Sequence, residues 1–341
     1  MPAPAQSQSR SLREAWSLGG VQVPNRVLLA PLAGIGNWFV RLQARRFGAG
    51  LVVSEMVSSH AVHHRNARTC RELLRIDRRE REGGPVAIQL FGSDPDVMRS
   101  AAASVAAAGA DLIDINMGCP VPKVCRTGAG AALLADGDRA VAVARAAREG
   151  SGLPVTVKLR SGWRAGDRDG IALAHRLVAE AGVAAIALHP RPATIAHRGR
   201  PDYELAAELV RTLDAPVLLS GGLQSVAAVH AAFSQTGAAG VMLARGALGN
   251  PWLFEQVLGV RSEPPGAGEV LAELDWVIAS AREHLGVERA GRYLRRFYPW
   301  YLERLALERA RARSLQAALQ QAGSFAAVRE CLAEALQAVP A

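Results

Sequence analysis

The 341-residue sequence has no run of apolar residues approaching the 18 or more that a bilayer span needs. Its first segment, MPAPAQSQSRSLREAW, lacks the apolar core of a secretory signal peptide. The four cysteines, Cys70, Cys119, Cys125 and Cys331, form no CxxC pair and no regular spacing. Neither a disulfide framework nor a zinc knuckle is therefore expected. These absences predict a cytoplasmic protein that binds neither a membrane nor a metal ion.

Aromatic residues make up only 5% of the chain, and lysine is rarer still. Half of the residues are hydrophobic, which excludes a disordered or fibrous chain. Only two of the 40 basic residues are lysines, Lys123 and Lys158, and the net charge is +9. Because arginine serves wherever any cation suffices, we expect these two positions to need a compact ammonium group, although chance is the alternative explanation. The positive charge favours a polyanionic partner.

Short runs rich in Val, Ile and Leu alternate with Ala-rich helical stretches, which is the pattern of parallel strands joined by helices. Eight strands are expected, at residues 27–32, 51–55, 85–90, 112–116, 154–158, 185–189, 216–220 and 240–244. Eight such units favour a (β/α)8 barrel over an open doubly wound sheet. The predicted fold class is therefore α/β, a TIM barrel followed by a helical domain.

The helical domain is expected to follow a Pro/Gly-rich segment, SEPPGAG at 262–268, after which only helical periodicity remains. We place the barrel at residues 1–262 and the helical domain at residues 263–341. Residues 289–313 contain eight arginines against two glutamates, interleaved with five aromatic residues. The aromatics are expected to pack on the barrel, whereas cations at this density can follow a phosphate backbone. Arg295 and Arg296 are the candidates for such contacts.

In a (β/α)8 barrel the functional groups gather where the strands end. Polar or conformationally special residues lie at or just past all eight predicted strand ends: Pro31, Glu55, Gln89, Asn116, Lys158, His189, Ser220 and Arg245. Two glycine-rich turns, at 220–222 and 244–246, follow the seventh and eighth strands, where such barrels build a phosphate site. The sequence has no GxGxxG motif after a strand and no P-loop, which excludes those two modes of nucleotide binding.

A flavin suits the polar groups expected at this barrel mouth. Gln89 can donate to and accept from the pyrimidine edge of the ring, and Lys158 can stabilise the negative charge that reduction places there. For Gln89 and His189 the alternative is a structural role at a strand end, which is the usual role of a lone histidine. The expected cofactor-binding residues are Pro31, Leu32, Ala33, Gln89, Lys158, His189, Ser220, Gly221, Gly222, Ala244, Arg245 and Gly246.

Cys119 lies three residues after Asn116 on a loop bounded by Gly118 and Pro120, a placement typical of a catalytic group. An unperturbed thiol has a pKa of about 8.5, so it is mostly protonated at neutral pH and can donate a proton. Cys119 is therefore predicted to be a general acid. The alternative, a buried small hydrophobe, fits poorly with the flanking glycine and proline. Cys125 follows where the chain is expected to turn away.

Six segments resemble the signature blocks of the tRNA-dihydrouridine synthases: LAPLAG (29–34), SEMV (54–57), QLFG (89–92), DINMGCPVPKV (114–124), VTVKLRSGW (155–163) and GALGNPWLF (246–254). Residues 284–302 are similar to the helical domain of the bacterial B-type subgroup. This resemblance implies a (β/α)8 barrel that holds FMN, a helical tRNA-binding domain, NADPH as reductant, and reduction of the uracil C5=C6 bond in the tRNA D-loop.

By the same resemblance, Cys119 matches the proton donor, and Gln89 and Lys158 match the ligands of the flavin ring. Ser220 departs from the family pattern by replacing an asparagine, which shortens or removes one contact to FMN. Ala193 replaces the second arginine of an HxRTR block, which puts one substrate contact in doubt. The residues expected to contact tRNA are Asn116, Lys123, Arg191, Arg295 and Arg296, and the chain is expected to be a monomer.

Two other functions remain open from the sequence. A small-molecule FMN oxidoreductase, of the dihydroorotate dehydrogenase or ene-reductase type, would explain the flavin site but not the basic helical region. A non-catalytic RNA-binding protein or chaperone on an inherited barrel would leave Cys119 and both lysines without a purpose.

Overall fold

The computed structural model describes residues 10–336, which form two compact units, one ending at Ala244 and the other beginning at Arg245. No helix in this described range is long and apolar enough to cross a membrane. The predicted boundary of the functional domains, after residue 262, stays a prediction.

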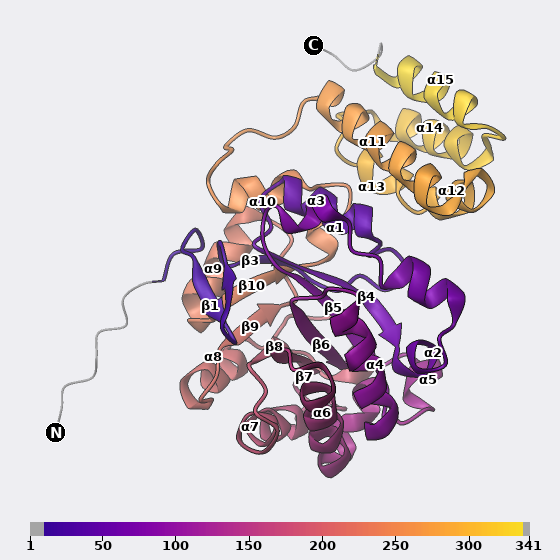
Figure 1. The fold of residues 1–341 in the computed structure, drawn as a ribbon. Helices are drawn as coiled ribbons and strands as arrows, with labels where there is room; N and C mark the ends of the chain where they lie inside the picture. Colours follow the sequence, from indigo (N-terminus) through magenta and orange to yellow (C-terminus); the bar gives the residue numbers. More distant parts are fainter. Residues whose placement is uncertain (1–9, 337–341) are drawn as a thin grey trace. The chain divides into compact units, whose positions relative to one another are not determined.

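Eight parallel strands close a barrel in the first unit (Figure 1). They are β3 (Val27–Leu29), β4 (Leu51–Ser58), β5 (Val86–Phe91), β6 (Leu112–Met117), β7 (Val155–Arg160), β8 (Ala185–His189), β9 (Val217–Ser220) and β10 (Gly240–Leu243). They follow one another in chain order, and β10 pairs with β3 to close the barrel. The predicted TIM barrel is therefore confirmed.

The first barrel strand is shorter than the sequence predicted. The backbone N–H of Ala30 still donates to the carbonyl of Leu243, at 2.8 Å. The next residue, Pro31, has no N–H to donate to β4 on the other side, so the strand ends at Leu29.

Helices surround the strands of the barrel (Figure 1). They are α1 (Trp38–Arg46), α2 (Ser59–His63), α3 (Arg78–Arg81), α4 (Pro95–Ala107), α5 (Pro122–Cys125), α6 (Gly137–Ser151), α7 (Asp169–Ala181), α8 (Tyr203–Thr212) and α9 (Val226–Thr236). A π-helical turn lies at Thr69–Leu73, and 3-10 turns lie at Gly130–Ala135 and Ala193–Ile195. Local sequence fixes several of the helix ends: the Asp94 carboxylate caps the start of α4, and Gly152, with φ of +67°, ends α6.

A hairpin that the sequence analysis missed precedes the barrel, formed by β1 (Trp16–Leu18) and β2 (Val21–Val23). Trp16, Leu18 and Val23 share one buried cluster with residues near the amino ends of the barrel strands, such as Leu28 and Leu112. The hairpin therefore closes the amino end of the barrel, which leaves the carboxyl end for a ligand site.

The second unit is helical, as predicted, and has no strand among its described residues 245–336. After a 3-10 turn at Arg245–Ala247 come α10 (Trp252–Val257), α11 (Ala267–Leu285), α12 (Val287–Leu294), α13 (Tyr298–Leu302), α14 (Arg309–Gln321) and α15 (Phe325–Leu336). Aromatic rings pack on one another in this unit: Phe297 lies 4.9 Å from Tyr293 and 5.0 Å from Trp300 between ring centroids.

Candidate active site at the carboxyl end of the barrel

Polar side chains replace apolar ones inside the barrel towards the carboxyl ends of β5, β6 and β7. Strand register places Asp114 between Gln89 and Thr156, and it places Asn116 beside Lys158. Because side chains alternate along a strand, Asp114 and Asn116 share the inward face with the core residue Leu112. Three neighbouring strands thus supply five polar side chains to one end of the barrel interior.

Four of these side chains form one hydrogen-bonded chain. The Asn116 Nδ2 donates to Gln89 Oε1 at 2.9 Å, and the Gln89 Nε2 donates to Asp114 Oδ2 at 2.6 Å. The Thr156 hydroxyl donates to Asp114 Oδ1, also at 2.6 Å. Gln89 is fully buried, so its amide plane is fixed by protein partners. Its predicted contact with a cofactor stays a prediction, and the contact that the structure shows is the one that orients Asn116.

Lys158 is a partly buried cation in this site. Its ammonium donates to the Ser220 hydroxyl at 3.0 Å, and no carboxylate among the described residues lies within ion-pair distance of it. Burial and the nearby Arg160 guanidinium lower the pKa of Lys158, whereas the Asp114 carboxylate raises it. Burial in turn raises the pKa of Asp114 above its usual range. An electron-rich edge of a ligand next to Lys158 would complete the hydrogen bonding of this ammonium.

The loop that carries Cys119 is held from both sides. The Asn116 Oδ1 accepts the backbone N–H groups of Gly118, at 3.2 Å, and of Cys119, at 2.9 Å. From β7, the Arg160 Nε donates to the Gly118 carbonyl at 2.8 Å. Cys119 itself is only partly buried. The hydrogen-bonded chain below the loop therefore fixes a thiol that remains accessible at the mouth of the barrel.

Cys125 is placed differently from Cys119. Its thiol points back into the loop and donates to the Cys119 carbonyl at 3.3 Å. Burial raises the pKa of the Cys125 thiol. This geometry makes Cys125 a structural partner of the loop.

The glycine turn after β9 packs tightly against His189. Gly221 has φ of +95°, and a Cβ built on it would lie 2.4 Å from His189 Cδ2. The Tyr203 hydroxyl donates to the Gly221 carbonyl at 2.9 Å. An Arg191 Nη1 lies 3.0 Å from His189 Nε2, so that nitrogen accepts and the imidazole is neutral. Burial and the neighbouring cations lower the pKa of His189 far below its usual range.

The other predicted site residues are more scattered. Arg191 is 5% exposed, and its Nη2 donates to the Gly199 carbonyl at 2.7 Å, so a tRNA contact there stays a prediction. Lys123 is exposed on α5. In the segment after β3, Pro31 is partly buried, Leu32 is buried and Ala33 is exposed. Ala244 ends the first unit, and the second unit contains Arg245, Gly246, Arg295 and Arg296.

Three residues of this site escaped the sequence analysis: Asp114, Thr156 and Arg160. A spacing of two residues could have indicated them. Asp114 lies two positions before Asn116, and Thr156 and Arg160 lie two positions before and after Lys158. Strand alternation puts each of them on the same face as a predicted site residue. Arg160 also joins two loops, since its Nη1 donates to the Ala196 carbonyl at 2.8 Å beyond β8.

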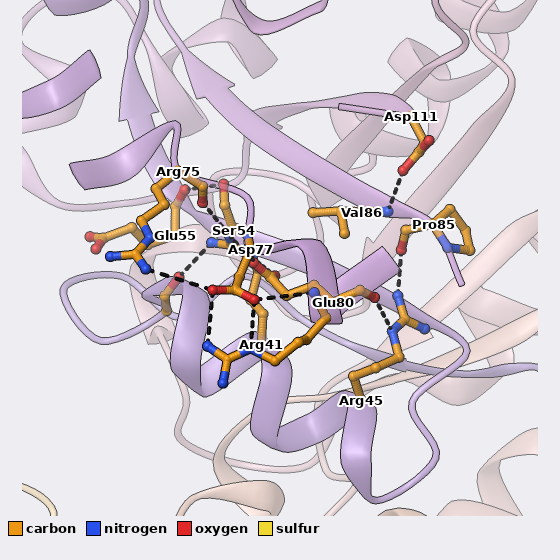
Figure 2. A network of polar contacts seen from close by, with 12 residues as sticks. Arg41, Arg45, Ser54, Glu55, Arg75, Asp77, Glu80, Pro85, Val86 and Asp111 are labelled. Atoms are coloured by element: carbon orange, nitrogen blue, oxygen red, sulfur yellow. Dashed lines mark hydrogen bonds and ion pairs between the residues drawn. The ribbon is translucent and has the colours of Figure 1, made fainter. Parts of the chain in front are cut away.

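A buried ion pair beside the segment after β3 was also missed (Figure 2). The Arg41 Nε lies 2.7 Å from Glu80 Oε2, and both side chains are almost fully buried. The Arg41 Nη1 also donates to the Gly36 carbonyl at 3.2 Å. Nearby, the Gly34 N–H donates to Glu55 Oε2 at 2.8 Å. These bonds fix the segment that contains Pro31, Leu32 and Ala33 from behind.

Comparison with known proteins shows what this chain is similar to. A family model described as "Dihydrouridine synthase (Dus)" matches residues 28–338. The "tRNA-dihydrouridine synthase B" of Pseudomonas aeruginosa is 36% identical over 293 residues, 84% of this chain and 87% of that protein. The "Probable tRNA-dihydrouridine synthase 1" of Synechocystis is 36% identical over 274 residues, 79% of this chain and 74% of that protein.

Several solved structures share the fold, and one of them serves as an example. The 2-naphthoyl-CoA reductase complex with 2-naphthoyl-CoA has a TM-score of 0.60 at 14% sequence identity. The match covers 74% of this chain, which spans about half of that reductase, 53%. At this identity the likeness concerns the fold alone.

Proposed function

Since this chain belongs to the dihydrouridine synthase family, we propose that it reduces uridine to 5,6-dihydrouridine in the D-loop of tRNA, with FMN as cofactor and NADPH as reductant. The observation that carries the proposal is the accessible Cys119 thiol, on a loop whose backbone is held by Asn116 and Arg160. A small-molecule reductase of the same fold has no need of the arginines at 289–313. Monomeric state and cytoplasmic location remain predictions.

The residues at the barrel mouth fit a flavin. A bound flavin supplies the hydride that is added to C6 of the uracil ring. The Lys158 ammonium, whose one protein acceptor among residues 10–336 is the Ser220 hydroxyl, can stabilise negative charge on the ring edge. The glycine turn at 220–222 follows β9, which is where (β/α)8 barrels use backbone N–H groups to bind a phosphate.

The chain's own chemical step is the delivery of a proton. Saturation of the C5=C6 bond needs a hydride at C6 and a proton at C5, and the Cys119 thiol can donate that proton. Asn116 and Arg160 hold the loop at Gly118 and Cys119, so the thiol keeps its position during the reaction. The uridine must leave its base stack to reach a thiol at the end of a barrel, so the enzyme acts on an extruded base.

The test is a reaction with purified protein, NADPH and tRNA that lacks dihydrouridine. The protein should be yellow, its flavin absorbance should bleach when NADPH is added, and mass spectrometry should find dihydrouridine in the D-loop. NADH in place of NADPH tests the choice of reductant. A colourless protein that FMN cannot reconstitute, or reduction of small enones without any reaction on tRNA, would overturn the proposal.

A single methyl group at Gly221 should reduce flavin binding. Gly221→Ala places a Cβ within 2.4 Å of the buried His189 ring at a positive φ, so the turn or the ring must move. Gly152→Ala is the matched control, because it has a positive φ but its Cβ would meet nothing within 4 Å. We expect the purified Gly221→Ala protein to carry at least about tenfold less flavin, whereas Gly152→Ala loses only about 1–2 kcal/mol of stability. The visible absorbance of the bound flavin and thermal melting check the two expectations. Equal flavin content in the two variants would contradict the first.

A further inference from the structure

The helical unit contains a cavity of about 390 Å³ that no part of the proposed reaction uses. It lies among α12, α13 and the turn between α14 and α15. Its lining includes Gly291, Arg295, Tyr298, Leu319 and Phe325. The volume is at the small end of the range of about 300–1,000 Å³ that is typical of ligand pockets.

The walls of this cavity offer a surface on which a flat ring can stack. Tyr298, Leu319 and Val328 are almost fully buried and form its apolar lining. Phe325 is partly exposed at the start of α15, and the Arg282 guanidinium lies 5.0 Å from the centre of its ring. Aromatic and aliphatic walls of this kind accept nucleobases of any sequence, because every base has a π-face.

The rim of the cavity carries positive charge. Glu288, Arg292 and Arg295 recur at helical spacing and all line it. Glu288 pairs with Arg292 at 2.7 Å, whereas the Arg295 guanidinium has no hydrogen bond or ion pair with any residue between 10 and 336. Arg295 is also exposed, so its guanidinium can take an anion from outside the protein.

We propose that this cavity binds one unpaired nucleotide of the tRNA, with the base against Phe325 and its phosphate on Arg295. The proposal rests on the proposed function, which supplies the RNA. Single-stranded RNA is recognised in this way, by stacking of splayed bases on aromatic side chains and by arginine contacts. The cavity anchors the tRNA at a nucleotide other than the uridine that is reduced.

Gly291 provides a direct test. It lies in the middle of α12, and a Cβ built there would meet nothing within 4 Å. Gly291→Leu therefore places its Cβ without a collision at the wall of the cavity. It also replaces a poor helix former by a good one, so the helix should be preserved. Gly268→Leu is the matched control, because Gly268 also faces open space in a helix, α11, and does not line the cavity.

We expect Gly291→Leu to weaken the binding of unmodified tRNA by about tenfold, with no change in the slope of affinity against salt, because it removes stacking and no charge. Gly268→Leu should bind like the parent. Arg295→Ala should weaken binding and reduce the salt slope by about one phosphate contact. Chemical probing should show one unpaired nucleotide of the tRNA that is protected in the complex with the parent. The same nucleotide should be reactive in the complexes with Gly291→Leu and Arg295→Ala.

A second measurement uses the unaltered protein and does not depend on how the variants fold. Photocrosslinking with 4-thiouridine-substituted tRNA should join a nucleotide to a peptide between residues 287 and 298 or between 319 and 328. If Gly291→Leu binds with parental affinity and protection, or if no crosslink reaches these peptides, the inference fails even though the parent makes dihydrouridine. If the parent neither binds tRNA nor makes dihydrouridine, the proposed function fails instead. Free UMP or AMP could also bind in the cavity. If Gly291→Leu abolished that binding and left tRNA binding unchanged, the cavity would be a site for free nucleotides and the proposed tRNA contact would be wrong.

Discussion

Cys119→Ala is expected to slow the reduction of uridine in tRNA by about 10²–10⁴-fold, which is the usual effect of removing a positioned acid. Alanine keeps the loop, because Asn116 and Arg160 bind its backbone and not the thiol. The variant should therefore remain yellow, accept electrons from NADPH and bind tRNA. The measurement is single-turnover reoxidation of the reduced flavin under anaerobic conditions, with tRNA that lacks dihydrouridine.

Cys125→Ala is the matched control for that experiment. The Cys125 thiol makes one long hydrogen bond to the Cys119 carbonyl, at 3.3 Å, which also accepts the Ala131 N–H at 2.9 Å. Loss of the sulfur leaves this carbonyl bonded, so we expect reoxidation close to that of the parent. If Cys125→Ala were the slow variant, or if Cys119→Ala reacted as fast as the parent, the proton donor would have to be sought elsewhere on the loop.

The barrel could be predicted because its strands are local signals. Each is a short apolar run followed by a helical stretch, and all eight runs fold as strands in the predicted order. The hairpin at residues 16–23 could not be predicted in the same way, because strands of three residues are too short to show an alternating pattern. Its place beneath the barrel is visible only in the packing of Trp16 and Leu18 with the barrel interior.

Sequence analysis named some residues of the candidate site, but it missed others and did not indicate how the side chains are connected. Strand ends pointed to Gln89, Asn116 and Lys158. Asp114, which accepts from Gln89 and whose charge raises the pKa of Lys158, lies within an apolar strand and was not noticed. Whether a side chain in this network contacts protein or ligand depends on which atoms form hydrogen bonds across neighbouring strands. Gln89 illustrates this, since its side chain is fully buried and bonded to two protein side chains, whereas its residue type alone indicated a ligand contact. Cross-strand contacts of this kind follow from register, which a single sequence specifies only loosely.

The buried ion pair between Arg41 in α1 and Glu80 in α3 could not be predicted from the sequence, because the two residues are 39 positions apart. Glu80 accepts from Arg41 at 2.7 Å and 3.1 Å and from the Asp77 N–H at 2.8 Å (Figure 2). Burial nevertheless raises the pKa of Glu80, so desolvation outweighs the attraction of Arg41. A raised pKa in the folded state means that ionisation of Glu80 costs stability as the pH rises through that value. The pair therefore adds little net stability, although each partner depends on the other.

Glu80→Leu is accordingly expected to lower the free energy of unfolding by about 3–5 kcal/mol, because it leaves the Arg41 guanidinium buried without its counter-charge. The double variant Arg41→Met with Glu80→Leu should recover part of that loss, since no unpaired charge remains. It should not recover all of it, because Arg41 also donates to the carbonyls of Gly36 and Arg75, at 3.2 Å and 2.7 Å, and these would lose a partner. Urea unfolding of the parent, both single variants and the double variant gives the coupling free energy between the two sites. A double variant as unstable as the sum of the single ones would show that the two side chains act independently, and a Glu80→Leu protein within about 1 kcal/mol of the parent would show that solvent reaches Arg41.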